Sequence, residues 1–180
     1  PPRAAPLDHA ASPKISHSSS WFAENFTEGA FVDGILGGEL ALPAGAVAEP
    51  FVSADDIADV AVEALLDPAH RGRTYELTGP RLLTFAEAVA EIAAASRREI
   101  RYRTVSTADF LAELGRAGLP EDALWLMQDL FTNTLDGRNA SVRPDVETVL
   151  GRKAEDFADF ARRAAREGAW RPAQALVGDA

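Results

Sequence analysis

The amino-acid sequence predicts one α+β domain in which helices pack on a few short strands. Two observations predict this class. First, residues 51–78 read as a capped helix followed by a strand: Ser53 and Asp56 have the spacing of a helix N-cap, an apolar stripe follows at helical period, and Asp67-Pro68 ends it. Second, no internal repeat and no linker divides the 180 residues. The stripe consists of Ile57, Val60, Ala61, Ala64 and Leu65.

The elements before and around this helix follow from similar signals. Residues 1–20 hold four prolines and no apolar period, so we expect a loop or an extended arm. Residues 21–36 carry a row of apolar side chains and end at two glycines, which predicts one helix. The short runs 39–42 and 74–77 alternate or lie between turn residues, which predicts two strands.

The second half of the chain is mostly helical by the same criteria. Thr84 and Glu87 have the spacing of a capping box that opens a helix to about residue 96. Residues 98–105 alternate between apolar or polar side chains and arginines, as in a strand with one wet face. Residues 121–135 are apolar on more than one side, so this helix is either central or faces a cavity. Further helices are expected at 106–117, 145–150 and 155–166, with a frayed tail at 171–180.

Composition excludes several classes of function. The chain has 28 acidic and 18 basic residues, a net charge of −10, which disfavours nucleic-acid partners because phosphates would be repelled. No run of 18 apolar residues is present, so we expect no membrane partner and a cytoplasmic location. The absence of cysteine excludes disulfides and thiolate nucleophiles, and the three histidines lack metal-ligand spacing, so no metal is expected.

Two runs carry a resemblance to a known family. Residues 51–58, Phe-Val-Ser-Ala-Asp-Asp-Ile-Ala, and residues 72–79, Gly-Arg-Thr-Tyr-Glu-Leu-Thr-Gly, resemble the second half of NmrA-like proteins. These are atypical members of the short-chain dehydrogenase/reductase superfamily, and many bind NAD(P)H. The resemblance implies that residues 21–170 are the C-terminal substrate-binding region of that fold, without the first strands of the Rossmann sheet. Residues 1–20 would then be an N-terminal arm and 171–180 a tail.

The motifs of a dinucleotide site are missing from this sequence. A Rossmann site needs a glycine-rich turn that opens a helix, and no such turn is present. Tyr75 and Tyr102 are not followed by the lysine of a Tyr-x-x-x-Lys pair. We therefore expect no cofactor, with NAD(P)H bound only if an N-terminal Rossmann half is supplied elsewhere. Either the chain is a fragment or it has dispensed with the cofactor. The apolar faces left uncovered favour a homo-oligomer, or a core rebuilt with the N-terminal arm.

Two aromatic groups are candidates for substrate binding. The resemblance places the first near the nicotinamide end of the cleft, where the Asn25 amide suits a carbonyl or hydroxyl group. The second lies on a helix that walls the substrate pocket in the resembling family. The alternative for both is plain core packing. The first group is Trp21, Phe22, Asn25 and Phe26, and the second is Trp125, Met127, Gln128 and Phe131.

A titratable group near these walls would serve acid–base chemistry. His17 is the candidate because it lies close to Trp21 and histidine exchanges protons near neutral pH. Asp33 and Glu24 are the candidate catalytic partners. A solvated residue on the arm is the alternative for His17.

Three functions are compatible with these observations. The first is a non-redox enzyme, an isomerase, cyclase or dehydratase, that acts on a small, apolar, oxygenated metabolite and derives from an NmrA-like reductase. The second is one part of an NAD(P)H-dependent oxidoreductase. The third is a binding or regulatory module without turnover. The first is our sequence-based hypothesis.

Overall fold

The computed structural model describes residues 14–16, 21–29 and 31–171 and combines helices with short strands. Within these ranges the strands pair only two at a time. This mixed helix and strand architecture agrees with the predicted class. The parallel pairs are β1 (Lys14–Ser16) with β4 (Thr74–Glu76) and β2 (Glu39–Leu42) with β6 (Arg101–Thr104), and the antiparallel pair is β3 (Ala48–Glu49) with β5 (Leu83–Thr84).

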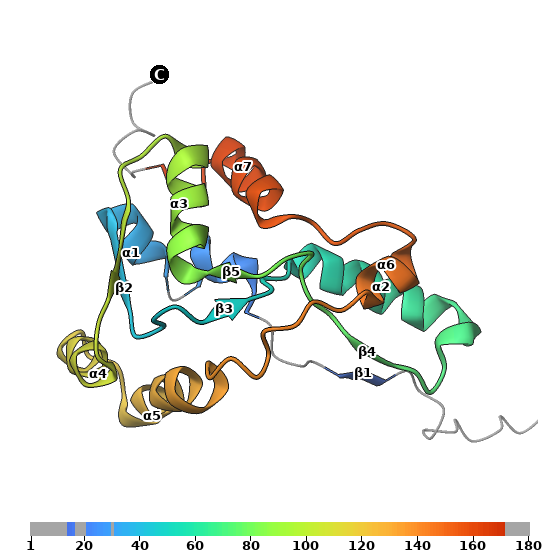
Figure 1. The fold of residues 1–180 in the computed structure, drawn as a ribbon, viewed down its shortest axis with the longest axis horizontal. Coiled ribbons are helices and arrows are strands. Elements are labelled where there is room, and N and C mark those ends of the chain that lie inside the picture. The colour runs from blue at the N-terminus through green and yellow to red at the C-terminus, as the bar shows by residue number, and fades with distance from the viewer. Residues whose placement is uncertain (1–13, 17–20, 30, 172–180) are drawn as a thin grey trace, which may run out of the picture.

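The helices pack in pairs around these ladders. Figure 1 shows α3 beside α7, α2 beside α6, and α4 beside α5, and each of these pairs is in contact. The α-helices are α1 (Val32–Gly37), α2 (Ala54–Leu66), α3 (Phe85–Ser96), α4 (Thr107–Arg116), α5 (Glu121–Asp129), α6 (Asp145–Leu150) and α7 (Phe157–Glu167). Two 3₁₀ turns, η2 (Ala23–Phe26) and η3 (Pro68–His70), and one π-helical segment, η4 (Leu130–Thr134), complete the description.

Side-chain caps set the helix starts, as the sequence indicated. The Ser53 hydroxyl accepts a hydrogen bond from the backbone N–H of Asp55 at the start of α2. Thr84 and Glu87 form both halves of a capping box at α3, and Ser106 accepts from the N–H of Asp109 at α4. These bonds satisfy amides that have no partner inside the helix, so local sequence fixes each boundary.

Residues 21–36 do not form the single helix that we predicted. Trp21 and Phe22 run beside Val52, where Val52 N–H donates to the Trp21 carbonyl and Ala23 N–H donates to the Val52 carbonyl. This parallel pairing holds the first residues extended, so only η2 and α1 are helical. A partner 30 residues away in the chain outweighs the local helical pattern.

Three further expectations need correction. Residues 14–16, which we placed in a loop or arm, form β1 against β4. Leu65, which we placed in the buried stripe of α2, is 74% exposed, because the core face of that helix is formed by Val60 and Ala64. The predicted helix 121–135 changes from α to π geometry after Asp129, and π-helical segments are often found at functional sites.

The main core is aromatic. Phe26, with no exposed surface, has its ring centroid 5.3 to 6.2 Å from those of four other phenylalanines. Those four are Phe31, Phe51, Phe85 and Phe157. A smaller cluster centred on Val60 and Tyr75 lies between α2 and α6. Among the described residues, no helix is long and apolar enough to cross a bilayer.

Candidate functional site

A cavity of about 810 Å³ opens where β2 and β6 meet α1, α4 and α5. Its volume falls within the range of pockets that hold small organic molecules. The walls are mainly apolar and come from Phe31, Leu40, Leu42, Val105, Phe110, Leu114, Leu119 and Met127.

Local sequence explains how these walls are placed. The parallel register of β2 and β6 aligns Leu40 with Tyr102 and Leu42 with Thr104. The Ser106 cap then starts α4 directly after β6. Because residues three and four positions apart share a helix face, Phe110 and Leu114 both line the cavity.

Charged side chains lie around the same cavity. The acidic members are Asp33, Asp109 and Glu113, and the basic members are Arg103 and Arg116. Both arginines are already in ion pairs, Arg116 with Glu113 and Arg103 with Glu39 of β2 at 2.9 Å. The lining therefore offers no unpaired positive charge, and an apolar, uncharged ligand suits it best.

An aromatic cluster lies directly behind this cavity. The Trp21 ring centroid is 5.7 Å from that of Phe31, in a stacked arrangement, and 5.3 Å from that of Phe131. Phe131 in turn contacts Phe110, with the centroids 5.1 Å apart. Since Phe31 and Phe110 line the cavity, Trp21 and Phe131 fix the positions of two wall residues.

The sequence-predicted site residues therefore separate into groups. Met127 and Asp33 line the cavity, whereas Trp21 and Phe131 pack behind it. Phe26 is part of the aromatic core. The predicted aromatic groups do not meet in this cavity. The remaining members are Phe22, which is 44% exposed, Trp125, which is 67% exposed, Asn25, which is half-buried beside Gly29, and Gln128, which is exposed on α5.

The acid–base candidates are placed differently from one another. His17 lies outside the described residues. The Glu24 carboxylate accepts hydrogen bonds from the Ala54 backbone N–H at 2.9 Å and from the Ser53 hydroxyl at 3.4 Å, so it helps to cap α2. Burial raises the pKa of Glu24, and the backbone hydrogen bonds oppose that increase. Its carboxylate thus connects η2 to the start of α2.

Sequence reasoning missed one titratable residue, Glu49 in β3. Its side chain has no exposed surface, and neither carboxylate oxygen has a hydrogen-bond partner among the described residues. Burial, with a smaller contribution from the charge of Asp136, raises the pKa of Glu49 to about 7. Hydrogen bonds from Arg138 lower the pKa of Asp136 to about 2, so the neighbouring charge persists at neutral pH. A single acid between Val47 and Phe51, in an otherwise apolar run, was the available signal.

One group of potential metal ligands lies on the described surface. Glu63, Asp67 and His70 each offer a ligand atom, and these atoms lie within 4.8 Å of one another. The three residues already have structural roles or are exposed: Asp67 accepts from the Ala69 N–H, and the His70 Nδ1 atom is 2.6 Å from the Tyr75 hydroxyl oxygen. This group is also outside the lining of the apolar cavity.

Comparison with known proteins places the fold among NAD(P)-binding reductases. The NADPH-dependent quinone oxidoreductase of Escherichia coli superposes with a TM-score of 0.70 at 23% identity, over 81% of this chain and 52% of that chain. Its complex with NADPH superposes with a TM-score of 0.71. At this identity the likeness establishes the fold alone. No family model matches the chain.

Several curated relatives of similar sequence are named as redox enzymes. The NAD(P)H azoreductase of Xenophilus azovorans is 36% identical over 125 residues, 69% of this chain and 44% of the relative. Agroclavine dehydrogenase of Claviceps fusiformis is 31% identical over 144 residues, 78% of this chain and 50% of the relative. The chain spans about half the length of these curated relatives.

These comparisons correct our expectation about the cofactor. We predicted none, and that prediction is wrong, because the relatives and structural neighbours include NAD(P)H-dependent reductases and one of these structures is an NADPH complex. The described residues do not themselves fit a pyrophosphate: α2, α3, α4 and α7 open on side-chain caps, and no glycine-rich turn precedes them.

Proposed function

We propose that this chain forms the substrate-binding part of an NAD(P)H-dependent oxidoreductase that reduces an apolar, oxygenated molecule. The observation that carries the proposal is the large cavity with apolar walls and no unpaired basic group. In the finer form of the proposal, residues 21–170 correspond to the C-terminal half of an NmrA-like fold. The relatives named as azoreductase and agroclavine dehydrogenase support a redox function.

The non-redox hypothesis has weaker support. An isomerase or cyclase acting in an aromatic cavity would need a proton donor or acceptor at the ligand. Of the candidates, Asp33 is at the cavity and Glu24 is bound to the start of α2. Relatives named as an azoreductase, a dehydrogenase and a quinone oxidoreductase favour redox chemistry. The oxidoreductase alternative is therefore the better reading.

The described residues would bind and orient the substrate. Phe31 and Phe110 line the cavity, and their contacts with Trp21 and Phe131 limit the ring positions. A flat conjugated ring gains surface burial and ring stacking in such a site, and the surrounding side chains exclude water from it. A quinone is a flat conjugated ring with carbonyl oxygens, so it matches the apolar, oxygenated substrate that we propose.

The first experiment measures binding of menadione, a neutral naphthoquinone, by isothermal titration calorimetry. Ala41 is a half-buried residue of β2 at the cavity, so Ala41→Phe fills part of the space. We expect this variant to bind menadione at least about tenfold more weakly. Ala61→Phe, at a half-buried alanine of α2 outside the cavity, is the matched control and should bind as the unmodified chain does. Equal affinity in Ala41→Phe would refute the assignment of the cavity.

A second experiment addresses the redox function. In a protein that joins these residues to an NAD(P)-binding Rossmann half, NADPH oxidation in the presence of menadione is followed by the absorbance of the reduced nicotinamide. This oxidation should stop in Ala41→Phe and persist in Ala61→Phe. Binding of menadione with rearrangement of a test substrate and no NADPH consumption would favour the non-redox hypothesis. The two experiments thus separate failure of the binding site from failure of the reaction class.

A further inference from the structure

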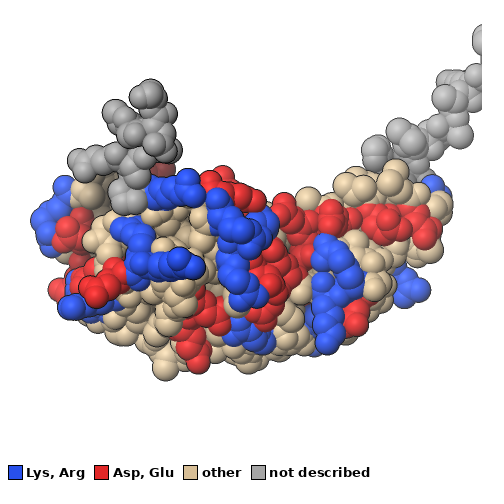
Figure 2. Space-filling view, turned by 90° about the horizontal axis from the view of Figure 1, so that it is seen from above, with Lys and Arg blue, Asp and Glu red and all other residues tan. Residues whose placement is uncertain are grey.

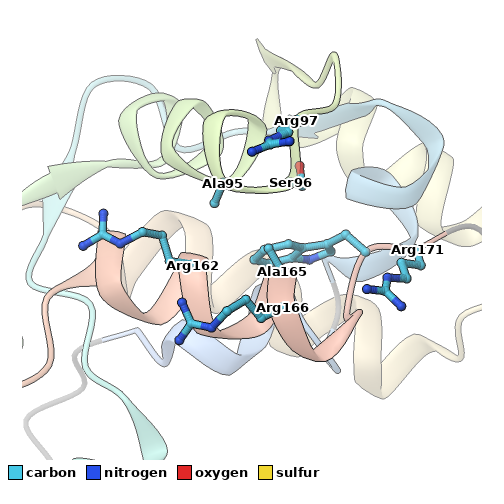
Figure 3. Close-up of a pocket in the computed structure, with 8 residues that line it drawn as sticks. Ala95, Ser96, Arg97, Arg162, Ala165, Arg166 and Arg171 are labelled. Carbon is cyan, nitrogen blue, oxygen red and sulfur yellow. The ribbon is translucent and has the colours of Figure 1, made fainter.

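A second pocket, of about 470 Å³, lies between the C-terminal ends of α3 and α7. Figure 3 shows Arg97 on the α3 side of this pocket, with Arg162, Arg166 and Arg171 on the α7 side. The face of the molecule drawn in Figure 2 carries both basic and acidic side chains. This pocket shares no lining residue with the apolar cavity.

Most of these arginines lack a counter-charge. Arg162 pairs with Asp159 one helical turn earlier. The guanidinium groups of Arg97, Arg166 and Arg171 have no ion pair or hydrogen bond among the described residues. Three positive charges without a partner among the described residues therefore lie at one pocket, on a chain whose net charge is −10.

Helix dipoles account for only part of this charge. The C-terminus of a helix carries roughly −0.5 of an elementary charge, and cations near it are stabilised. Two helices end at the pocket, which offsets about one of the three unpaired charges. About two positive charges remain, which matches the charge of a phosphate monoester at neutral pH.

The backbone at Arg97 gives an independent reason to expect a role for its side chain. Arg97 is the C-cap of α3 and has φ 56°, the single non-glycine residue with positive φ in the described ranges. Glycine is favoured in this left-handed conformation because it has no Cβ to clash with the backbone. An arginine at this position costs folding stability and places a guanidinium at the pocket.

We propose that this pocket binds a phosphate group of a small molecule, held by Arg97, Arg166 and Arg171. Guanidinium groups bind phosphate oxygens through paired, charge-assisted hydrogen bonds, and arginines from the end of α3, from α7 and from the segment after α7 line this pocket. The phosphate has two possible sources, a free phosphorylated metabolite or the 2′-phosphate of NADPH. The proposal does not rest on the proposed oxidoreductase function.

The experiment is a phosphorus NMR titration of inorganic phosphate with the full chain, compared with chloride at matched ionic strength in a thermal-unfolding assay. We expect phosphate to bind and to raise the unfolding temperature beyond the effect of chloride. The double variant Arg166→Gln/Arg171→Gln should weaken phosphate binding at least about tenfold. The matched control, Arg73→Gln/Arg101→Gln, removes two exposed arginines elsewhere and should change binding less than about twofold.

Arg97→Gly separates a binding role from a structural one. Glycine relieves the positive φ, so this variant should unfold at the same or a higher temperature while phosphate affinity falls. Comparison of NADPH with NADH distinguishes the two sources: competition with phosphate by NADPH alone identifies the 2′-phosphate, and competition by neither identifies a separate metabolite. Equal losses of phosphate affinity in both double variants would overturn the proposal. So would equal effects of phosphate and chloride on the unfolding temperature.

Discussion

The Trp170 indole N–H donates a 2.7 Å hydrogen bond to the backbone carbonyl of Phe26, which joins the end of the described chain to its first helical turn. Trp170 is 2% exposed. The bond holds η2 against the region after α7, and η2 continues into the aromatic cluster behind the cavity. The core that supports the candidate site therefore depends on residues 144 positions apart.

Trp170→Phe should destabilise the fold. The substitution retains an aromatic ring but leaves the buried Phe26 carbonyl without its donor, which costs about 1 to 3 kcal/mol. Urea unfolding followed by circular dichroism measures the free energy of unfolding. Trp125→Phe is the control, because Trp125 is 67% exposed and its replacement should change stability by less than about 0.5 kcal/mol. Equal effects of the two substitutions would contradict this role for Trp170.

Asp56→Asn should destabilise the fold more than Asp59→Asn does. Asp56 is buried, and its carboxylate accepts from Arg152 at 2.6 Å and from the Glu155 backbone N–H at 2.7 Å. Loss of this buried charge should cost about 2 to 3 kcal/mol of unfolding free energy. Asp59 pairs with the same arginine but is exposed, so its loss should cost less than about 1 kcal/mol. Thermal unfolding of both variants tests this order.

Glu49 should make the fold less stable as pH rises. Its pKa is raised from 4.5 to about 7 in the folded chain, so folding favours the protonated acid. Below pH 4.5 both states are protonated and stability is not reduced. Between pH 4.5 and 7 the unfolded chain ionises first, so stability falls, and above pH 7 the full penalty of up to about 3 kcal/mol applies.

The variant Glu49→Gln removes this titration. We expect its stability relative to the unmodified chain to be about 2 to 3 kcal/mol more favourable at pH 8 than at pH 5. Urea unfolding at the two pH values provides the measurement. Glu28→Gln, at an exposed position, should show no such pH difference. If the free energy of unfolding changed equally with pH in both variants, the pKa of Glu49 would not be raised by folding.

The apolar cavity should discriminate against anions. Its acidic side chains outnumber the basic ones, and both basic groups are already paired. Neutral menadione should therefore bind at least about tenfold more tightly than its sulfonated derivative, because the sulfonate must be desolvated near carboxylates. Competition titrations give the ratio. A preference for the sulfonate would show that Arg103 or Arg116 leaves its ion pair to receive the ligand.

Self-association stays a prediction. The exposed apolar residues Val62, Leu65 and Leu66 lie on α2, and Trp125 and Leu126 lie on α5. Their exposure is compatible with a partner surface but does not identify the partner.

Local sequence determined most of the secondary structure. The caps at Ser53, Thr84 and Ser106 and the apolar periods after them were sufficient for α2, α3 and α4, because cap and helix lie within a few residues of one another. The resemblance found in residues 51–79 also indicated the fold of NAD(P)-binding reductases that the structural comparison gives. The caps with their apolar periods and the family resemblance are each contained in short stretches of the chain.

Tertiary structure alone decided the features of the candidate site. Pairing with Val52 keeps the start of the predicted helix 21–36 extended. Packing buries the Glu49 carboxylate without a hydrogen-bond partner among the described residues. The cavity and the arginine pocket each combine residues from segments far apart in the sequence. Periodicity shows which residues share a face of one helix or strand, but burial and charge at a site depend on which faces meet, and that is settled only when the whole chain packs.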